Sequence, residues 1–346
     1  MNKSTLSYFT GSLWFTAVCL GLAAWLGYST GGVDGMLSML FVATLLACLE
    51  VSVSVDNAVV NATVLNVMTP FWRKIFLTVG MAIAVFGMRI LFPIMIVDFA
   101  SGVGFVDAFT IATTQPEQYS KIMHDAHVAV MGFGGTFLLT VAIAYFIDND
   151  KGEHWLPIEK HLAKLDETRS LPYGIMVGIL ALTTYFVDPA QQFTFILACA
   201  AGFGTHILID IMKHFVGGGD IISVAARNGF VGFMYLEVLD ASFSFDGVVA
   251  ALAITNHFWT IAIGLGIGAM FVRSMTIYLV EKGTLTEFRY LEPAAFWAIS
   301  FLVLSMMLAA AHIELGELVV GGGSLAIIGA GLWHSIRANK ADAANA

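Results

Sequence analysis

Two short polar motifs stand out in an otherwise apolar sequence. The first, EVSVSVDN, runs from Glu50 to Asn57, and the second, DASFSFDG, runs from Asp240 to Gly247. Each has an acidic residue, two serines at alternate positions and an aspartate six positions after the first acid. These side chains offer hard oxygen donors, which suit Mg²⁺, Ca²⁺ and Mn²⁺, whereas zinc and copper ions favour nitrogen or sulfur. The motifs therefore predict a site for a hard divalent cation.

The residues assigned to this site fall into two sets. The predicted metal ligands are the motif acids, one asparagine and an extra acid one turn before the second motif: Glu50, Asp56, Asn57, Glu237, Asp240 and Asp246. The predicted supporting residues are the motif serines and an arginine in the helix after each motif: Ser52, Ser54, Ser242, Ser244, Arg89 and Arg273. Because four or five carboxylates cannot all stay ionised in a low dielectric, we expect protons or the arginines to neutralise them in the empty site. The competing interpretation is that Arg–Asp pairs only hold helices together.

Helical geometry refines the first motif. At about 100° per residue, Glu50, Ser54 and Asn57 share one stripe, whereas Ser52 and Asp56 lie about 120° away. Polar side chains on two faces predict a helix that is surrounded by protein. We expect this helix to be continuous, and the alternative is an unwound break near the final aspartate of each motif.

A second, weaker pattern lies further along the chain. His206, Asp210 and His214 are spaced four residues apart, on one face of a predicted helix. His206 and Asp210 could form a proton relay. However, Asp210 also lies within a turn of Lys213, so a simple pair at the membrane surface is the preferred interpretation.

The composition places these motifs in a membrane. Of 346 residues, 58% are hydrophobic and only 12% are charged, and the mean hydropathy is +0.83; soluble chains carry about twice that share of charge. The net charge of −9 argues against a nucleic-acid partner. The sequence contains no nucleophile triad, phosphate-binding loop or HExxH motif, so we predict no enzymatic activity and no permanently bound cofactor. The chain is expected to be an all-α polytopic membrane protein.

Ten segments approach the roughly 20 apolar residues that a spanning helix needs. They are 11–28, 37–66, 75–97, 126–147, 171–187, 193–212, 229–255, 258–280, 294–312 and 318–336. With ten spans, thirteen basic residues fall on one side of the membrane and Lys121 alone falls on the other. By the positive-inside rule the richer side is the cytoplasm. We therefore expect an inner-membrane protein with both termini in the cytoplasm.

The two motifs belong to an internal repeat. Each is followed by a Phe-Trp pair, and the next helix carries a glycine with an arginine nine positions later. These pairs are Gly80 with Arg89, and Gly264 with Arg273. Agreement at this many polar positions in an apolar chain predicts a tandem duplication.

The duplication divides the chain into a first membrane repeat, 1–187, which includes the cytoplasmic linker 148–170, and a second membrane repeat, 188–346. Five spans in each half, an odd number, would insert the second half upside down relative to the first. Inverted repeats of this kind occur in secondary transporters, whose substrate site lies near the middle of the bilayer where the repeats meet. We therefore expect the two motifs to come together there.

The stretch EVSVSVDNAVVNATVL, the second copy DASFSFDG and the following Phe-Trp pairs resemble the paired signature of the TerC-like integral membrane proteins of the LysE superfamily. The closest similarity is to an uncharacterised, domain-of-unknown-function branch of that group. The resemblance implies divalent metal handling, with manganese efflux as the leading activity, and a link to tellurium or metal stress. The positions that match are Glu50, Asp56, Asn57, Asp240 and Asp246. The sequence departs from symmetry at Gly247, which stands where the first copy has Asn57, and at the extra acid Glu237.

Three functions are compatible with these features. The preferred one is a transporter of divalent cations, exporting Mn²⁺ or Ca²⁺ in exchange for protons across the lipid bilayer. The second is a small-solute exporter whose acids carry protons only. The third is a membrane scaffold that assists a partner during metal or tellurium stress. The oligomeric state is left open by the sequence.

Overall fold

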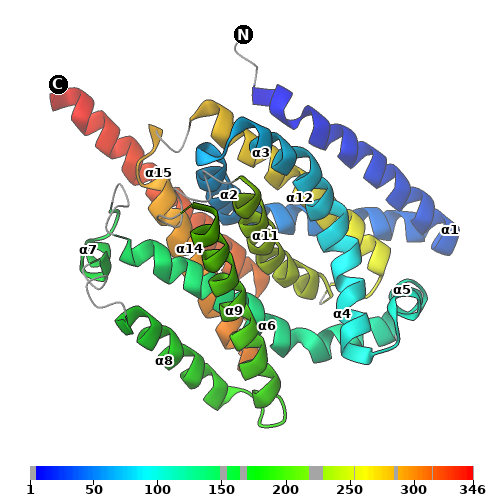
Figure 1. Cartoon of the computed structure of the whole chain (residues 1–346). Coiled ribbons are helices and arrows are strands. Elements are labelled where there is room, and N and C mark those ends of the chain that lie inside the picture. The colour runs from blue at the N-terminus through cyan, green and yellow to red at the C-terminus, as the bar shows by residue number, and fades with distance from the viewer. Residues whose placement is uncertain are drawn as a thin grey trace.

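The computed structural model describes residues 5–148, 154–163, 170–217, 229–252, 254–283, 287–313 and 315–345. Within these ranges every regular element is a helix, so the expected all-α class is confirmed. The elements are α1 (Thr5–Val53), α2 (Val55–Val67), α3 (Pro70–Ile75), η1 (Phe76–Gly80), η2 (Ile83–Leu91), α4 (Phe92–Ser101), α5 (Phe105–Thr114), α6 (Pro116–Ile147), α7 (Pro157–Ala163), α8 (Ser170–Phe186), α9 (Gln192–Gly217), α11 (Gly229–Leu252), α12 (Phe258–Lys282), α14 (Leu291–Ala310) and α15 (Glu317–Asn345) (Figure 1).

Several of these helices have the length and the apolar composition of membrane-spanning helices. In the described part of the chain, seven segments are long and apolar enough to cross a bilayer: Thr5–Ser52, Pro70–Ser101, Pro116–Ile147, Gln192–Ile209, Phe258–Lys282, Leu291–Ala310 and Val319–Asp342. The segments in α6, α12 and α14 are mostly buried inside the protein, whereas those in α1, α9 and α15 leave most of their apolar surface exposed. A largely exposed apolar helix is stable where lipid covers it. The chain is therefore an integral membrane protein.

The seven segments are three fewer than the ten spans predicted from the sequence, and the difference has three sources. The first two predicted spans correspond to the two arms of α1, which the non-helical Gly31 and Gly32 join within the single segment Thr5–Ser52, and the second span continues into α2. The apolar part of α8, Tyr173–Phe186, is shorter than the other spanning segments. The remaining one, α11, carries Glu237, Asp240 and Asp246 within its apolar sequence. The count of ten spans and their inverted arrangement thus stay predictions.

The long helix α1 reverses direction part-way along its length. Gly31 and Gly32 have non-helical backbone angles, and Gly32 has φ +61°, which glycine adopts without steric cost. The two arms then run side by side, because a Cβ atom added at Gly27 would lie 2.6 Å from the carbonyl oxygen of Gly35. Figure 1 shows this hairpin in blue beside α12. Ser12 on the first arm bonds the Ser274 hydroxyl of α12 at 2.6 Å.

The first polar motif lies at the junction of α1 and α2. Ser54 separates the two helices with φ −99° and ψ 19°, yet its own N–H still bonds the carbonyl of Glu50 and its carbonyl still accepts from Ala58. The interruption therefore bends the helix at one residue and does not unwind it. In the second motif, α11 continues through Asp246 to Leu252. The expected continuous helix is thus present in the second motif and is interrupted once in the first, two positions before Asp56.

The helix that follows the first motif is wider than an ordinary α-helix. The segments η1 and η2 are π-helical, and they connect α3 to α4 without a loop. Pro93 in the first turn of α4 has no N–H to donate to this ladder. Single π-helical turns are often found at functional sites because they shift side chains out of the regular register. Arg89 lies in η2.

The predicted linker, 148–170, packs against α14 and α15. Its helix α7 contains Glu159, which is fully buried. The Glu159 carboxylate accepts a hydrogen bond from Trp297 Nε1 of α14 at 2.8 Å, and Trp155 Nε1 donates to His334 Nδ1 of α15 at 2.8 Å. These two hydrogen bonds hold the predicted linker against α14 and α15.

Candidate cation site

A small polar cavity lies where the two motifs meet. Side chains and backbone of α1, α2, η2, α11 and α12 form its wall: Glu50, Asn57, Asn61, Ala84, Arg89, Asp240, Ala269, Val272, Arg273 and Thr276. Two acids, two arginines and two asparagines from distant parts of the chain thus surround one space. That space is narrow, on the scale of a single water molecule or ion.

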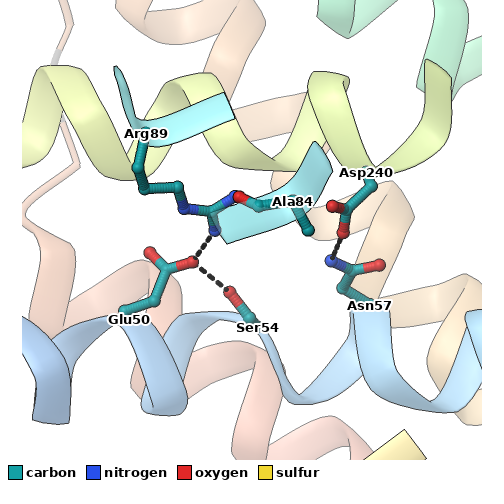
Figure 2. A network of polar contacts seen from close by, with 6 residues as sticks. All are labelled: Glu50, Ser54, Asn57, Ala84, Arg89 and Asp240. Carbon is teal, nitrogen blue, oxygen red and sulfur yellow. Dashed lines mark hydrogen bonds and ion pairs between the residues drawn. The ribbon is translucent and has the colours of Figure 1, made fainter. Parts of the chain in front are cut away.

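Glu50 and Arg89 form an ion pair on one side of this cavity (Figure 2). Both residues are buried, each with 4% of its surface exposed. The Ser54 hydroxyl donates to Glu50 Oε1 at 3.4 Å, and Arg89 Nη1 donates to the Ala84 carbonyl at 3.1 Å. A buried carboxylate is stable only when it is paired and hydrogen-bonded in this way. Glu50, Ser54 and Arg89 therefore act as one neutral unit.

Glycines allow the Glu50 side chain to approach the second half. A Cβ atom added at Gly247 of α11 would lie 2.7 Å from Glu50 Oε2, and one added at Gly268 of α12 would overlap the Glu50 side chain. The asymmetry noted in the sequence thus has a steric reason: an asparagine at position 247 would collide with Glu50.

The two motifs are joined directly by one hydrogen bond. Asn57 Nδ2 donates to Asp240 Oδ1 at 2.8 Å, and Figure 2 shows the two side chains pointing at each other from α2 and α11. Asn57 and Asp240 are 3% and 6% exposed. The bond leaves Asn57 Oδ1 and Asp240 Oδ2 available to a further partner.

Within the part of the chain that the structure describes, three buried oxygen atoms of the cavity residues have no hydrogen-bond partner. They are Asn57 Oδ1, Asn61 Oδ1 and Asp240 Oδ2. A buried polar atom without a partner costs about 1–3 kcal/mol, so each one requires an explanation such as a bound ion or water. Amide and carboxylate oxygens are the donors that Ca²⁺, Mg²⁺ and Mn²⁺ prefer. The chemistry of this donor set therefore suits a hard cation.

Asn61 was not among the residues assigned to the site from the sequence. A signal was present, because Asn61 follows Asn57 by four positions and so lies on the same face of a helix. Both asparagines stand in α2, and both line the cavity.

The other predicted ligands are not on the wall of this cavity. Asp56 is fully buried and accepts a hydrogen bond from the backbone N–H of Asn57 at 2.8 Å. Glu237 lies beside Arg273 and lines a separate, apolar cavity together with Met88 and Phe133. Asp246 lies in α11, but its side chain is outside the part of the structure described here. Among the side chains that are described, no three His, Cys, Asp or Glu residues are grouped as a metal site.

The predicted supporting serines have different surroundings. Ser54 contacts Glu50, as the shared stripe predicts. Ser52 is exposed and donates to the carbonyl of Cys48, so the face of the helix at Ser52 is not covered by protein. Ser242 donates to the carbonyl of Val238, and Ser244 is buried.

The predicted relay residue His206 is away from the cavity wall. It is buried in α9, and its ring packs against Phe137 with centroids 6.1 Å apart. The side chain of Asp210 lies outside the described residues. The relay therefore stays a prediction.

Residues 55–342 match the model of a protein family described as "Protein of unknown function (DUF475)". The chain belongs to the DUF475 family. The match covers most of the chain, from the start of α2 to the last turns of α15, and it includes Asn57, Asn61, Arg89 and the second motif. The hairpin α1, with Glu50 near its end, precedes the part of the chain that the DUF475 match covers. No curated protein and no solved structure matches the chain.

Proposed function

We propose that this DUF475 protein is a membrane transporter that exports a divalent cation, Mn²⁺ or Ca²⁺, in exchange for protons. The observation that carries the proposal is the cavity at the junction of the two motifs. There Asn57 of the first motif is bonded to Asp240 of the second, and three buried hard oxygens have no partner. A cation bound among these oxygens would give each of them the partner that the described side chains do not provide.

The charge balance of the predicted spans supports exchange with protons. They contain six acidic residues, Glu50, Asp56, Asp210, Glu237, Asp240 and Asp246, and only two arginines, Arg89 and Arg273. Ionised carboxylates at membrane depth are costly unless they are neutralised. Asp210 has Lys213 within a turn, but the other three acids in excess of the arginines need protons when the site is empty, and a divalent cation can replace two of those protons. Such replacement is the basis of cation/proton exchange.

The size of the cavity favours an ion over an organic solute. Its free space is on the scale of one water molecule, and buried side chains enclose it. A small-solute exporter needs a pocket of several hundred cubic ångströms at its binding site. We therefore prefer the cation transporter to the solute exporter, and we prefer both to the scaffold role.

The packing of the motif helices supports the inverted repeat. Gly264, the counterpart of Gly80, lies against α1, where an added Cβ atom would be 2.6 Å from Leu46 Cβ. Gly80 in turn lies against α11, where an added Cβ atom would be 2.5 Å from Glu237 Oε1. Each motif helix thus packs on the glycine of the other half. We propose ten spans in two inverted halves, a relation to the TerC-like proteins, and an inner-membrane location with both termini in the cytoplasm.

The test is transport by purified protein in proteoliposomes. Mn²⁺, Ca²⁺, Mg²⁺ and Zn²⁺ are offered in turn, with a pH-sensitive dye inside the vesicles, to wild type, Asp240→Asn and Asn57→Ala. Ser52→Ala is the matched control, because Ser52 belongs to the same motif but is exposed. We expect flux of Mn²⁺ or Ca²⁺ with opposing proton movement, lost in the first two variants and kept in the control. Absence of cation flux from a folded wild-type sample would overturn the proposal.

A further inference from the structure

Arg273 of α12 lies near two carboxylates of α11, Asp240 and Glu237. It lines the polar cavity together with Asp240, whereas Glu237 is outside that cavity. Both acids act electrostatically on the Arg273 guanidinium. The three side chains are buried, with 4%, 6% and 7% of their surfaces exposed for Arg273, Asp240 and Glu237.

The guanidinium and the Glu237 carboxylate lie close together without bonding. A Cβ atom added at Gly80 would be 2.5 Å from Glu237 Oε1 and 2.9 Å from Arg273 Nη2, so the two groups flank the same glycine. No described residue forms a hydrogen bond with Arg273 Nε, Arg273 Nη2 or either Glu237 carboxylate oxygen. When Glu237 is ionised, a small movement would give it a charge-assisted hydrogen bond with the Arg273 guanidinium.

The surface beneath the guanidinium permits such a movement. Arg273 Cζ lies 3.7 Å from the centroid of the Phe76 ring, one turn before Gly80 on the same helical segment. A cation stays attracted to an aromatic face while it lies within about 6 Å of the ring centroid. The guanidinium can therefore shift across the Phe76 ring without losing this contact.

We propose that Glu237 is a positioning residue that receives the Arg273 guanidinium when a divalent cation enters the cavity beside Asp240. This inference rests on the proposed transport function. A cation at Asp240 repels Arg273, and Glu237 offers the displaced charge a partner on the far side of Gly80. Without Glu237, the guanidinium stays near Asp240 and competes with the cation. Glu237 thus promotes cation binding through Arg273, without contacting the cation itself.

The experiment is a double-mutant cycle on cation affinity. Mn²⁺ and Ca²⁺ binding to the full-length protein in detergent is measured by calorimetry for wild type, Glu237→Gln, Arg273→Gln and the double variant. We expect Glu237→Gln to raise the Kd at least tenfold in the wild-type background and less than about twofold in the Arg273→Gln background. Glu237→Asp, which keeps the charge, is expected to restore the affinity to within about threefold of wild type.

The outcomes separate this inference from the proposed function. If Glu237→Gln weakens binding equally in both backgrounds, Glu237 is a direct ligand and the inference is wrong. If it changes the Kd in neither background, Glu237 has no part in binding and the inference is also wrong. If folded wild type binds neither cation, the proposed function itself fails. Should Glu237→Gln not fold, Glu237→Met replaces it in both arginine backgrounds, because methionine removes the carboxylate and suits the apolar cavity that Glu237 lines.

Discussion

Asn57 donates its side-chain amide to Asp240 across 2.8 Å, and this bond joins two polar motifs that are 183 positions apart in the chain. Both partners are buried, so water does not compete for the bond. We expect Asn57→Ala to lower the free energy of unfolding by about 1–3 kcal/mol, because Asp240 then loses its donor in a buried site. Thermal unfolding in detergent measures this loss, and Ser52→Ala should leave the midpoint unchanged.

The Glu50–Arg89 pair gives a second prediction. Glu50→Gln leaves the buried Arg89 charge without a counter-charge, which typically costs about 3–5 kcal/mol. The variant Glu50→Gln/Arg89→Gln removes both charges and should be more stable than Glu50→Gln alone. Unfolding midpoints of Glu50→Gln, Arg89→Gln and the double variant test this prediction. If the losses of the single variants simply added in the double variant, Glu50 and Arg89 would not stabilise each other.

Asn61 provides a test of the unpartnered oxygens. Its Oδ1 has no hydrogen-bond partner among the described residues, so Asn61→Ala removes a proposed cation ligand without breaking a bond at that oxygen. We expect Asn61→Ala to weaken Mn²⁺ binding about tenfold with little change in the unfolding midpoint. Asn61→Asp adds a negative charge to the same position and should favour the divalent cation. Unchanged Kd values in both variants would remove Asn61 from the site.

Two glycines of α12 offer a matched pair of substitutions. A Cβ atom at Gly268 would overlap the Glu50 side chain and lie 3.0 Å from the Ala47 carbonyl, whereas one at Gly266 would meet its nearest neighbour, Val85, at 3.8 Å. Overpacking of this kind typically costs about 1–3 kcal/mol. Gly268→Ala should therefore lower the unfolding midpoint and disturb the Glu50–Arg89 pair, while Gly266→Ala stays close to wild type.

His257 makes the start of α12 sensitive to pH. Its side chain accepts a hydrogen bond from the Thr260 N–H as the N-cap of α12, which requires an unprotonated ring nitrogen. Burial lowers the pKa of His257 below its ordinary value of 6.5. Because the folded state resists a proton that the unfolded state accepts, the stability contribution is full above pH 6.5 and is lost as the pH falls below it.

The variant His257→Ser tests this pH dependence, because serine is a good N-cap that does not titrate in this range. We expect the wild-type unfolding midpoint to fall between about pH 7 and pH 5 by more than that of His257→Ser. Equal slopes for the two proteins would contradict the assignment.

Helix positions could be predicted from the sequence where apolar runs are long. The predicted segments 229–255 and 258–280 correspond to Gly229–Leu252 and Phe258–Lys282, because charged or polar residues end each apolar run. The short helix α5, Phe105–Thr114, was not predicted as a separate element. Its ten residues are fewer than a spanning helix needs, so hydropathy alone gives no signal for it.

The site was harder to predict than the helices. The stripe of Glu50, Ser54 and Asn57 follows from helical periodicity, and the structure shows these residues as neighbours. The exposure of Ser52 and the position of Glu237 beyond Arg273 do not follow from periodicity. Both depend on which neighbouring helix covers a face and where a long arginine side chain extends, and these are properties of tertiary packing.

The contact between α1 and α12 also has a consequence for synthesis in the membrane. Ser12 emerges from the ribosome long before its partner Ser274, which is 262 positions later. Until α12 is synthesised, the α1 hairpin therefore lies in the bilayer without its packing partner, and lipid covers its apolar surface. Ser12 and Thr16 can bond backbone carbonyls one turn away during this delay, as Thr16 still does. Completion of the cavity near Glu50 is thus a late event in the biogenesis of the protein.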